Sequence, residues 1–349
     1  MSCLQENWGL EFTAEEIAAC RQKGGLLSLE LELSRVCNLR CLYCYAESGT
    51  ALDHELSLAE ILSVIDQARE LGARKIIVLG GGEPLLYPDI FTVIDHIVDL
   101  DLQVDLFTNA TLIDTHTAHQ LYDQGVAVSM KMNSRRPEIQ DRLAGKKGTF
   151  EAIQQGLAAL LDAGYPDDDH ILGIESIICR HNYDEIPELW RWARNRDIIP
   201  YIEAMTMQGR ARQNPELEVS SAEIRRMFET LAEIDATEFD RQWLPIPPLA
   251  ASHCARHEYS CTVTSIGDVN PCPGVNIRAG NIRQRPLREI LATSPVIAEL
   301  RNIRQNIKGK CGSCDFNDHC YGCRGHAYQV TGDHLAPDPL CWIEPMAKN

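Results

Sequence analysis

The chain has 349 residues, of which 44% are hydrophobic, and it carries a formal net charge of −17. This length accommodates one large α/β domain and a smaller one. The acidic balance argues against a nucleic-acid partner, because phosphate binding needs a basic surface. The sequence has no apolar run long enough to span a bilayer, and residues 1–10 lack the basic and apolar segments of a secretion signal. We therefore expect a cytoplasmic protein with no membrane partner.

Apolar runs alternate with helical periodicity from about residue 27 to residue 235, which predicts a repeated order of strand and helix. The expected strands are Leu27–Leu33, Lys75–Leu79, Gln103–Phe107, Val126–Met132, Ile171–Ile178 and Ile199–Met205. The expected helices are Leu58–Leu71, Pro88–Asp99, Asp114–Gln124, Thr149–Ala163, Asp184–Arg196 and Ser220–Ile234. Parallel strands need helical crossovers of this kind. The sequence therefore predicts an α/β fold with a parallel sheet, and periodicity leaves open whether that sheet is doubly wound or curved into a barrel.

A proline-rich hinge, residues 245–248, separates this regular part from a cysteine-dense tail. Such composition shifts are common at domain boundaries. We therefore expect an N-terminal extension (residues 1–26), an α/β core (27–240) and a small cysteine-rich domain (241–349).

Three of the 14 cysteines, Cys37, Cys41 and Cys44, follow the first expected strand in a Cys-x3-Cys-x2-Cys spacing. In a reducing compartment, clustered cysteines indicate metal or cluster ligation rather than disulfides. Three thiolates in one loop suit a four-iron cluster in which one iron lacks a protein ligand. The alternative is a structural zinc loop, although zinc takes four ligands in a closed tetrahedron and no fourth ligand stands nearby.

The next candidate motifs also follow strands, on the face where α/β folds carry their sites. Gly81, Gly82 and Glu83 come after the second expected strand, and glycines there allow a ligand to approach the backbone closely. Thr108 and Asn109 end the third strand. We expect all of these residues to meet in one pocket with the cysteine triplet.

The triplet, with Tyr43 before its last cysteine, resembles the signature of the radical S-adenosylmethionine (SAM) superfamily. The resemblance implies a partial (β/α)6 TIM-like barrel and a [4Fe-4S] cluster on Cys37, Cys41 and Cys44, whose open iron binds SAM. It also implies an enzyme that cleaves SAM reductively to a 5′-deoxyadenosyl radical, which abstracts hydrogen from a substrate. A flavodoxin or ferredoxin would supply the electron.

By the same resemblance, Gly81, Gly82 and Glu83 match the segment that binds the amino end of SAM, and Thr108 and Asn109 match a Thr-Asn-Gly segment. Gly209 begins a Gly-Arg-Ala segment near the adenine.

The family often has a serine that contacts the SAM ribose where this chain has Lys131. A buried lysine is costly unless a carboxylate pairs with it. We therefore expect Lys131 either to contact SAM or to bind an anionic substrate group in catalysis. An outward-pointing lysine is the alternative.

Eight cysteines follow the hinge, which is the number that two fully ligated four-iron clusters need. The segment resembles a SPASM domain: Gly267-x4-Cys272 and Cys311-x2-Cys314-x5-Cys320 match its pattern, and the next interval is one residue short. The resemblance implies two auxiliary clusters, one on Cys254, Cys261, Cys272 and Cys323 and the other on Cys311, Cys314, Cys320 and Cys341. Zinc is again the alternative, because paired Cys-x2-Cys motifs also occur in zinc ribbons.

SPASM enzymes often modify peptides, so we expect a peptide or protein substrate that is crosslinked, epimerised or oxidised. The alternative substrate is a small molecule, such as a tetrapyrrole, a cofactor precursor, a sugar or a nucleoside, which is oxidised, decarboxylated or rearranged. Lys131 and the basic stretch of residues 273–310 favour a substrate with carboxylates. Pro273 argues against sulfatase maturation, because those enzymes carry an aspartate there. A non-catalytic electron-transfer protein is a third possibility, which the intact triplet and Gly-Gly-Glu segment disfavour.

Overall fold

Six parallel strands in chain order form the centre of the molecule, in a computed structural model that describes residues 12–344. They are β1 (Ser28–Glu32), β2 (Lys75–Leu79), β3 (Gln103–Thr108), β4 (Ala127–Lys131), β5 (Leu172–Ile178) and β6 (Ile199–Ala204). Each strand is parallel to its neighbour. All six expected strands are confirmed. Residues 1–11 lie outside the described residues. They include part of the expected N-terminal extension and the segment in which no secretion signal was expected.

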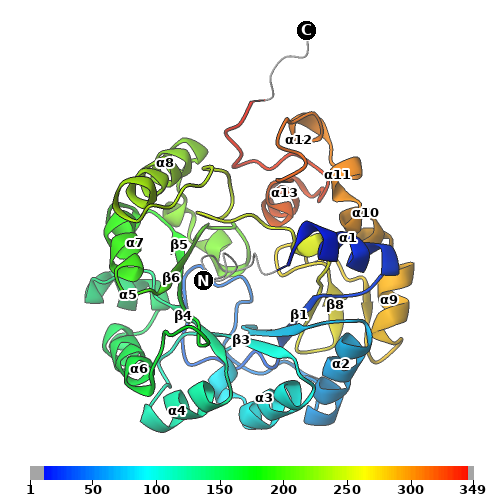
Figure 1. Cartoon of the computed structure of the whole chain (residues 1–349), viewed down its shortest axis with the longest axis horizontal. Helices are drawn as coiled ribbons and strands as arrows, with labels where there is room; N and C mark the ends of the chain where they lie inside the picture. The colour runs from blue at the N-terminus through cyan, green and yellow to red at the C-terminus, as the bar shows by residue number, and fades with distance from the viewer. Residues whose placement is uncertain (1–11, 345–349) are drawn as a thin grey trace.

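Helices surround this sheet on its outer side (Figure 1). They are α2 (Leu58–Glu70), α3 (Ile90–Asp99), α4 (Thr115–Asp123), α5 (Pro137–Ala144), α6 (Thr149–Ala163), α7 (Ile186–Arg194) and α8 (Ser221–Glu238). Helix α1 (Ala14–Lys23) precedes β1. Two helices were not predicted from the sequence: α5 is too short to show a helical period, and in α1 only Cys20 is buried.

Capping residues fix where the long helices begin. In α2, Ser57 and Glu60 form a reciprocal capping box, and Ser220 and Glu223 form the same motif at α8. Each box satisfies two backbone N–H groups that the helix itself leaves free. Helix α5 ends at Gly145, whose φ of +67° is the left-handed conformation that glycine adopts most easily.

The C-terminal part continues the same sheet. Strand β7 (Thr262–Val263) pairs in parallel with β1, and β8 (Asp268–Asn270) and β9 (Gly280–Asn281) follow in antiparallel pairing. The strand order is β6-β5-β4-β3-β2-β1-β7-β8-β9. The helices of the C-terminal part are α9 (Leu287–Thr293), α10 (Pro295–Arg301), α11 (Ile303–Asn306), α12 (Gly309–Gly312) and α13 (Arg324–Thr331). The expected α/β class, with a mostly parallel sheet and a cysteine-rich C-terminal region, is confirmed; the three domain boundaries stay a prediction.

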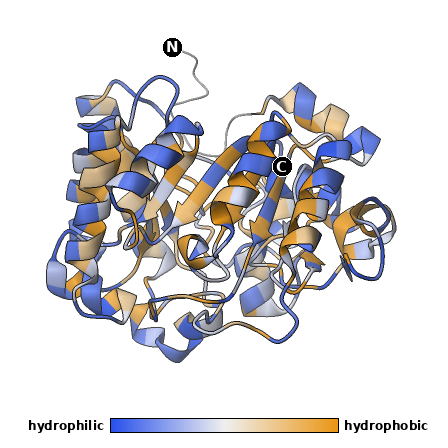
Figure 2. Cartoon of the chain, turned by 90° about the horizontal axis from the view of Figure 1, so that it is seen from below, coloured by the Kyte–Doolittle hydropathy of each residue, from blue (hydrophilic) through white to orange (hydrophobic). Residues whose placement is uncertain are grey.

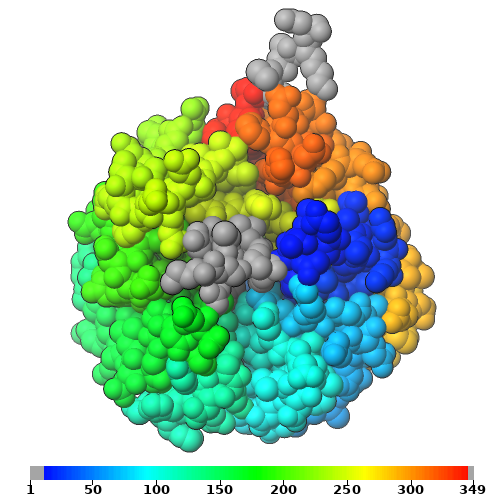
Figure 3. Space-filling model, viewed as in Figure 1, coloured from blue at the N-terminus to red at the C-terminus, as the bar shows by residue number. Residues whose placement is uncertain are grey.

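Short 3-10 helices complete the chain: η2 (Pro84–Leu86), η3 (Tyr183–Glu185), η4 (Gly209–Gln213), η5 (Pro215–Leu217) and η6 (Arg256–Glu258). Helix α1 lies beside the C-terminal part (Figure 3), where Arg21 pairs with Glu258 at 3.1 Å. None of the described helices is both long and apolar enough to cross a membrane.

Alternate residues of β1 point to opposite sides of the sheet. Leu29 and Leu31 are fully buried in the main hydrophobic core under the helices. Glu30 and Glu32 face the other side, where they bond to Arg256 and to Tyr45. Figure 2 shows apolar residues along the strands and on the sides of the helices that face them. The barrel interior is therefore the side on which polar chemistry is available.

The basic stretch of residues 273–310 does not form a free cationic surface. Most of its cations are engaged in ion pairs within the chain: Arg278 with Asp268, Arg283 with Glu60, Arg285 with Glu289, Arg304 with Glu258, Lys308 with Asp333, and Lys310 with Glu344. The remaining two bond to backbone carbonyls, Arg288 to that of Glu70 and Arg301 to that of Gly25. The stretch therefore offers little unpaired charge for an acidic partner or a substrate carboxylate.

Candidate active site

The three cysteines of the triplet converge in the loop after β1. Burial, together with the neighbouring Cys44 and Cys37, raises the pKa of Cys41 to about 12. Burial also raises the pKa of Cys37, with smaller contributions from Glu83 and Cys44. Thiols that resist ionisation in the metal-free protein release protons when a metal or cluster takes their thiolates. The three side chains are therefore close enough to influence one another.

The donor set of the triplet fits a four-iron cluster, in which three thiolates leave one iron without a protein ligand. Cys37, Cys41 and Cys44 would hold the cluster. Within residues 12–344, no group of three Cys, His, Asp or Glu side chains is arranged to hold a single metal ion.

The 3-10 helix η4, which follows the last barrel strand β6, holds one side of the cysteine loop. In η4, Arg210 donates from Nε to the carbonyl of Cys41 at 2.8 Å and from its backbone N–H to the carbonyl of Cys44 at 3.0 Å. Gly209 has a φ of +55°, and a Cβ on it would lie 2.4 Å from the carbonyl oxygen of Tyr45. Gly209, which was predicted to lie near the SAM adenine, thus packs directly on the loop.

Arg210 belongs to the predicted Gly-Arg-Ala segment but was not itself among the predicted site residues. Its Nη1 donates to the carbonyl of Ser48 at 3.0 Å, while its Nη2 is buried and has no hydrogen-bond partner among residues 12–344. Burying an unpaired donor is costly, so this nitrogen is suited to a ligand. On the other side of the loop, the backbone N–H groups of Arg40 and Leu42 donate to the last carbonyls of α5, at 3.0 and 2.9 Å.

The glycine-rich turn after β2 packs against the residue before the first cysteine. The N–H of Glu83 donates to the carbonyl of Val36 at 2.8 Å. A Cβ on Gly82 would lie 2.0 Å from that carbonyl oxygen, and Gly81 has a φ of +91°. Only glycine permits this close approach.

The carboxylate of Glu83 joins this turn to the end of β3. It is 4% exposed and accepts from the hydroxyl of Thr108 at 2.6 Å and from the N–H of Asn109 at 2.7 Å. Burial raises the pKa of Glu83, and these hydrogen bonds oppose that rise. Asn109 also donates to the amide of Asn38 in the cysteine loop at 2.8 Å. The structure therefore brings together the cysteine loop, the glycine-rich turn and the end of β3. Glu83 places a fixed carboxylate there that is suited to an ammonium group.

Lys131 ends β4 inside the barrel, with its side chain 15% exposed and its Nζ 2.8 Å from Glu175. The Nζ also lies 5.1 Å from the ring centre of Tyr43, the aromatic residue of the triplet. Burial alone would lower the pKa of Lys131, but Glu175 and Glu203 outweigh it and raise the pKa. The lysine thus has the carboxylate partner that burial requires. Contact with SAM or substrate stays a prediction.

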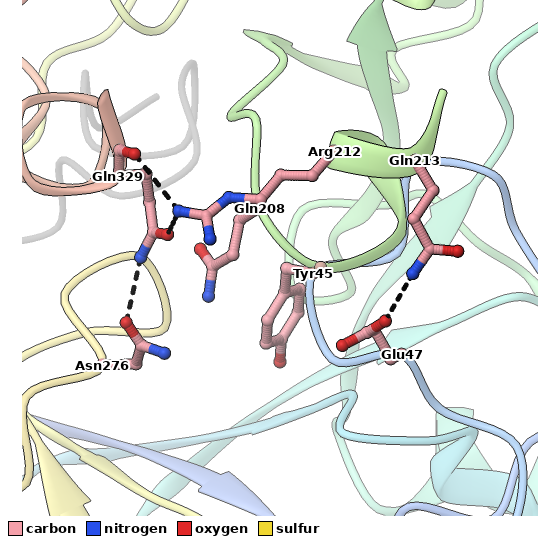
Figure 4. Close-up of a pocket in the computed structure, with 8 residues that line it drawn as sticks. Tyr45, Glu47, Gln208, Arg212, Gln213, Asn276 and Gln329 are labelled. Atoms are coloured by element: carbon pink, nitrogen blue, oxygen red, sulfur yellow. Dashed lines mark hydrogen bonds between the residues drawn. The ribbon is translucent and has the colours of Figure 1, made fainter. Parts of the chain in front are cut away.

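A polar cavity of about 330 Å³ lies beside the cysteine loop. Figure 4 shows side chains from three parts of the chain around it: the loop, η4 and the cysteine-rich region. The lining residues are Tyr45, Glu47, Gln208, Gly209, Arg212, Gln213, Asn276 and Gln329.

Hydrogen bonds across this cavity connect the barrel to the C-terminal part. The Nη2 of Arg212 donates to the side-chain oxygen of Gln329 at 2.7 Å, and Gln329 donates to Asn276 at 2.9 Å. Gln208 donates to the carbonyl of Pro273 at 2.9 Å.

Three of the tail cysteines gather near the barrel. Burial and Asp338 raise the pKa of Cys323, with further contributions from Cys272 and Cys254. Burial and Glu30 raise the pKa of Cys272 to about 12, and Cys254 adds to the effect. These three predicted ligands of one auxiliary cluster therefore lie near one another.

Cys261, the fourth predicted ligand of that cluster, has different surroundings. Burial raises its pKa to about 12, and its charged neighbours are Arg301 and Glu30. No tail cysteine contributes to that shift. Cys261 thus has Arg301 and Glu30 as its charged neighbours, whereas Cys254 and Cys272 both act on Cys323.

The second predicted set gathers around the turn of α12. Burial raises the pKa of Cys320 to about 11, with contributions from Cys341, Asp338 and Cys311. Cys314 follows Cys311 in one turn, through a 3.4 Å hydrogen bond from its N–H to the Cys311 carbonyl. These thiols would hold the other auxiliary cluster.

Comparisons with known proteins agree with this geometry. The family profile of the radical SAM superfamily matches residues 31–193, and that of an iron–sulfur cluster-binding domain, SPASM, matches residues 254–315. An AdoMet-dependent heme synthase of Methanosarcina barkeri is 30% identical, over 91% of this chain and 96% of that protein. An Fe-coproporphyrin III synthase of the same organism is 26% identical, over 89% and 86%.

A mycofactocin maturase of Mycobacterium ulcerans is also 26% identical, over 90% of this chain and 87% of that protein. Among solved structures, Streptococcus suis SuiB bound to S-adenosylmethionine has a TM-score of 0.70 at 18% identity and covers 93% of this chain and 80% of that chain. This likeness shows a shared fold. Iron–sulfur clusters of the [4Fe-4S] type and SAM are accordingly the cofactors, and the protein is an enzyme. The chain belongs to the radical SAM superfamily and carries a C-terminal SPASM domain.

Proposed function

We propose that this enzyme oxidises a carboxylate-bearing side chain of a tetrapyrrole. The observation that carries the proposal is the similarity to the AdoMet-dependent heme synthase of M. barkeri, which runs over 91% of this chain and 96% of that protein. It thus includes both the barrel and the cysteine-rich region. The similarity to an Fe-coproporphyrin III synthase points to the same class of substrate. We therefore favour a small-molecule substrate, the alternative in the sequence-based expectation, over a peptide substrate.

The reaction that fits such a substrate is the conversion of a propionate to a vinyl group. The cluster and SAM, when bound, supply a radical that removes one hydrogen atom from the carbon β to the carboxyl group. The bond to the carboxylate then breaks, so that carbon dioxide and one electron leave and a carbon–carbon double bond forms. A one-electron acceptor of the iron–sulfur class takes the electron.

Residues of the barrel would orient both reactants. Glu83, held by Thr108 and Asn109, is the carboxylate for the SAM ammonium group. The ammonium group of Lys131 has three donors, and Glu175 receives one of them. The other two can meet a substrate carboxylate, because such a group is an acceptor only.

The charge around Lys131 supports this assignment. Burial and the neighbouring Glu175 raise the pKa of Glu203 to about 7. With that pKa, Glu203 is only partly ionised near neutral pH, so it adds less negative charge beside the Lys131–Glu175 pair than a fully ionised carboxylate would. Lys131 would therefore hold the propionate while hydrogen is removed.

An anaerobic isotope experiment tests the proposal. Reconstituted enzyme, SAM and dithionite are incubated with iron coproporphyrin III that carries deuterium on the β-carbons of its propionates. We expect deuterium in 5′-deoxyadenosine and a product that has lost one carboxyl group and one hydrogen per converted side chain. Release of 5′-deoxyadenosine without deuterium, with the porphyrin unchanged, would refute the tetrapyrrole proposal.

Peptide modification is the second candidate. The similarity to a mycofactocin maturase supports it, and so does the cavity beside the cysteine loop, since the amides of Gln208, Gln213, Asn276 and Gln329 line it. Side-chain amides can donate to and accept from a peptide backbone. If a short open reading frame lies next to the gene, the peptide that it encodes is the one to test, and deuterium transfer from that peptide would favour this candidate. A flavodoxin or ferredoxin as electron donor stays a prediction.

A further inference from the structure

One of the eight tail cysteines lies on the outer side of the sheet. Cys261 stands directly before β7, and its carbonyl accepts from the N–H of Glu30 in β1 at 3.0 Å. The next residue, Thr262, points inward and donates from its hydroxyl to Glu30 at 2.5 Å. Because successive side chains of a strand point to opposite faces, Cys261 points outward, as Val263 does. Both are buried in the hydrophobic core.

The neighbours of Cys261 confirm its direction. Burial lowers the pKa of Arg301 in α10, and Cys261 and Cys20 oppose that effect. Cys20 belongs to α1, and Arg301 itself donates to the carbonyl of Gly25 at 2.7 Å. Cys261 therefore faces the layer formed by α1 and α10, outside the barrel.

Two other tail cysteines, Cys272 and Cys323, border a single backbone contact between Gly274 and Gly325. An ideal Cβ on Gly274 would lie 2.7 Å from the Cα of Gly325 and 3.8 Å from the Sγ of Cys272. An ideal Cβ on Gly325 would lie 3.0 Å from the Cα of Gly274 and 3.4 Å from the Sγ of Cys323. The contact between the two glycines brings both thiols to one place, at the start of α13.

We propose that the auxiliary cluster nearest the barrel has three cysteine ligands, Cys254, Cys272 and Cys323, and that Cys261 is a core thiol. One iron of this cluster is then left for a donor other than cysteine. The assignment differs from the one that the resemblance to a SPASM domain implies, in which Cys261 completes a set of four. Turning Cys261 inward would require a one-residue shift of β7, which would move every side chain of that strand to the other face.

Iron content distinguishes the two assignments without reference to activity. Anaerobically reconstituted wild-type protein should hold about twelve irons in three four-iron clusters. Cys261→Val fills the buried site with a side chain that cannot bind iron, and it should keep the same iron and sulfide content. Cys272→Ala removes a ligand and should lose about four irons. Electron paramagnetic resonance of the reduced proteins, with SAM in excess, should show one cluster signal missing only in Cys272→Ala.

Controls separate loss of a ligand from loss of folding. Cys20→Ala removes a buried thiol on the same outer side as Cys261 and shows what such a change does to stability and iron content. Thermal unfolding and gel filtration identify folded fractions, and iron is counted in these alone. If Cys261→Val does not fold, Cys261→Ala replaces it. A folded Cys261 variant that loses iron and a cluster signal as Cys272→Ala does would overturn the proposal.

Discussion

Replacing Gly209 with alanine should separate the cysteine loop from the segment that holds it. A Cβ at this position would lie 2.4 Å from the carbonyl oxygen of Tyr45 and 2.5 Å from that of Cys44. Ordinary contact distances are longer, so the loop or η4 must move by roughly 1 Å. The φ of +55° adds a backbone cost of about 1–2 kcal/mol for any residue with a Cβ.

A displacement of about 1 Å near reacting groups can cost on the order of 100-fold in rate. We therefore expect Gly209→Ala to release 5′-deoxyadenosine from SAM about 100-fold more slowly under dithionite. It should also lose up to about four of its twelve irons, because the carbonyls of Cys41 and Cys44 would no longer be held by Arg210.

Gly125→Ala is the matched control. Gly125 has a φ of +67°, but nothing lies within 4 Å of its ideal Cβ. This variant bears the backbone cost of about 1–2 kcal/mol without the steric clash, so it should be less stable and keep its iron and its SAM cleavage. If the two variants lost stability equally and both kept normal SAM cleavage, close packing at Gly209 would have no bearing on the cluster.

Three other changes test separate parts of the molecule. Lys131→Met should raise the Michaelis constant for SAM or for the substrate severalfold with iron content unchanged; unaltered kinetics would exclude a binding role. Asp235→Ala leaves the buried guanidinium of Arg194, 2.9 Å away, without its carboxylate, and urea unfolding should show a loss of about 3–5 kcal/mol; a loss under about 1 kcal/mol would contradict the buried pair. A hydrogen bond from Arg283 lowers the pKa of Glu60 from 4.5 to about 2. The ionised Glu60 therefore contributes its full stabilisation of the folded state above pH 4.5, and this contribution is lost as the pH falls toward 2. The stability difference between wild type and Glu60→Gln should shrink over that interval; a difference independent of pH would contradict the ion pair.

The parts of the site that could be predicted from the sequence are those encoded over short distances. The cysteine triplet and the Gly-Gly-Glu segment each lie within one loop, so their spacing alone carries the information. The strands were predictable because their apolar runs are short and bounded by polar loops. Helix α5 was missed because its eight residues give too few turns for a periodic signal.

Residues that act on the loop from far along the chain were less visible. Glu175 reaches Lys131 across 44 positions, and Arg210 reaches Cys41 across 169. The sequence signal for Glu175 is a charged residue inside the otherwise apolar strand β5. This signal was overlooked because the strand was predicted from its apolar run alone. Cys261 shows a further limit of the sequence, because a count of thiols does not tell which face of a strand each one occupies.

The geometry of the cysteine loop is a property of the whole barrel and not of the loop itself. Four segments that follow different strands fix its backbone or side chains: the turn at Gly82, the end of β3 at Asn109, the end of α5 at Ala144, and η4 at Arg210. Because these segments are separated in sequence, they reach their positions only when the parallel sheet has formed in the right order. The three thiols therefore come together as a consequence of folding, and a cluster bound by them stabilises that arrangement of the barrel in return.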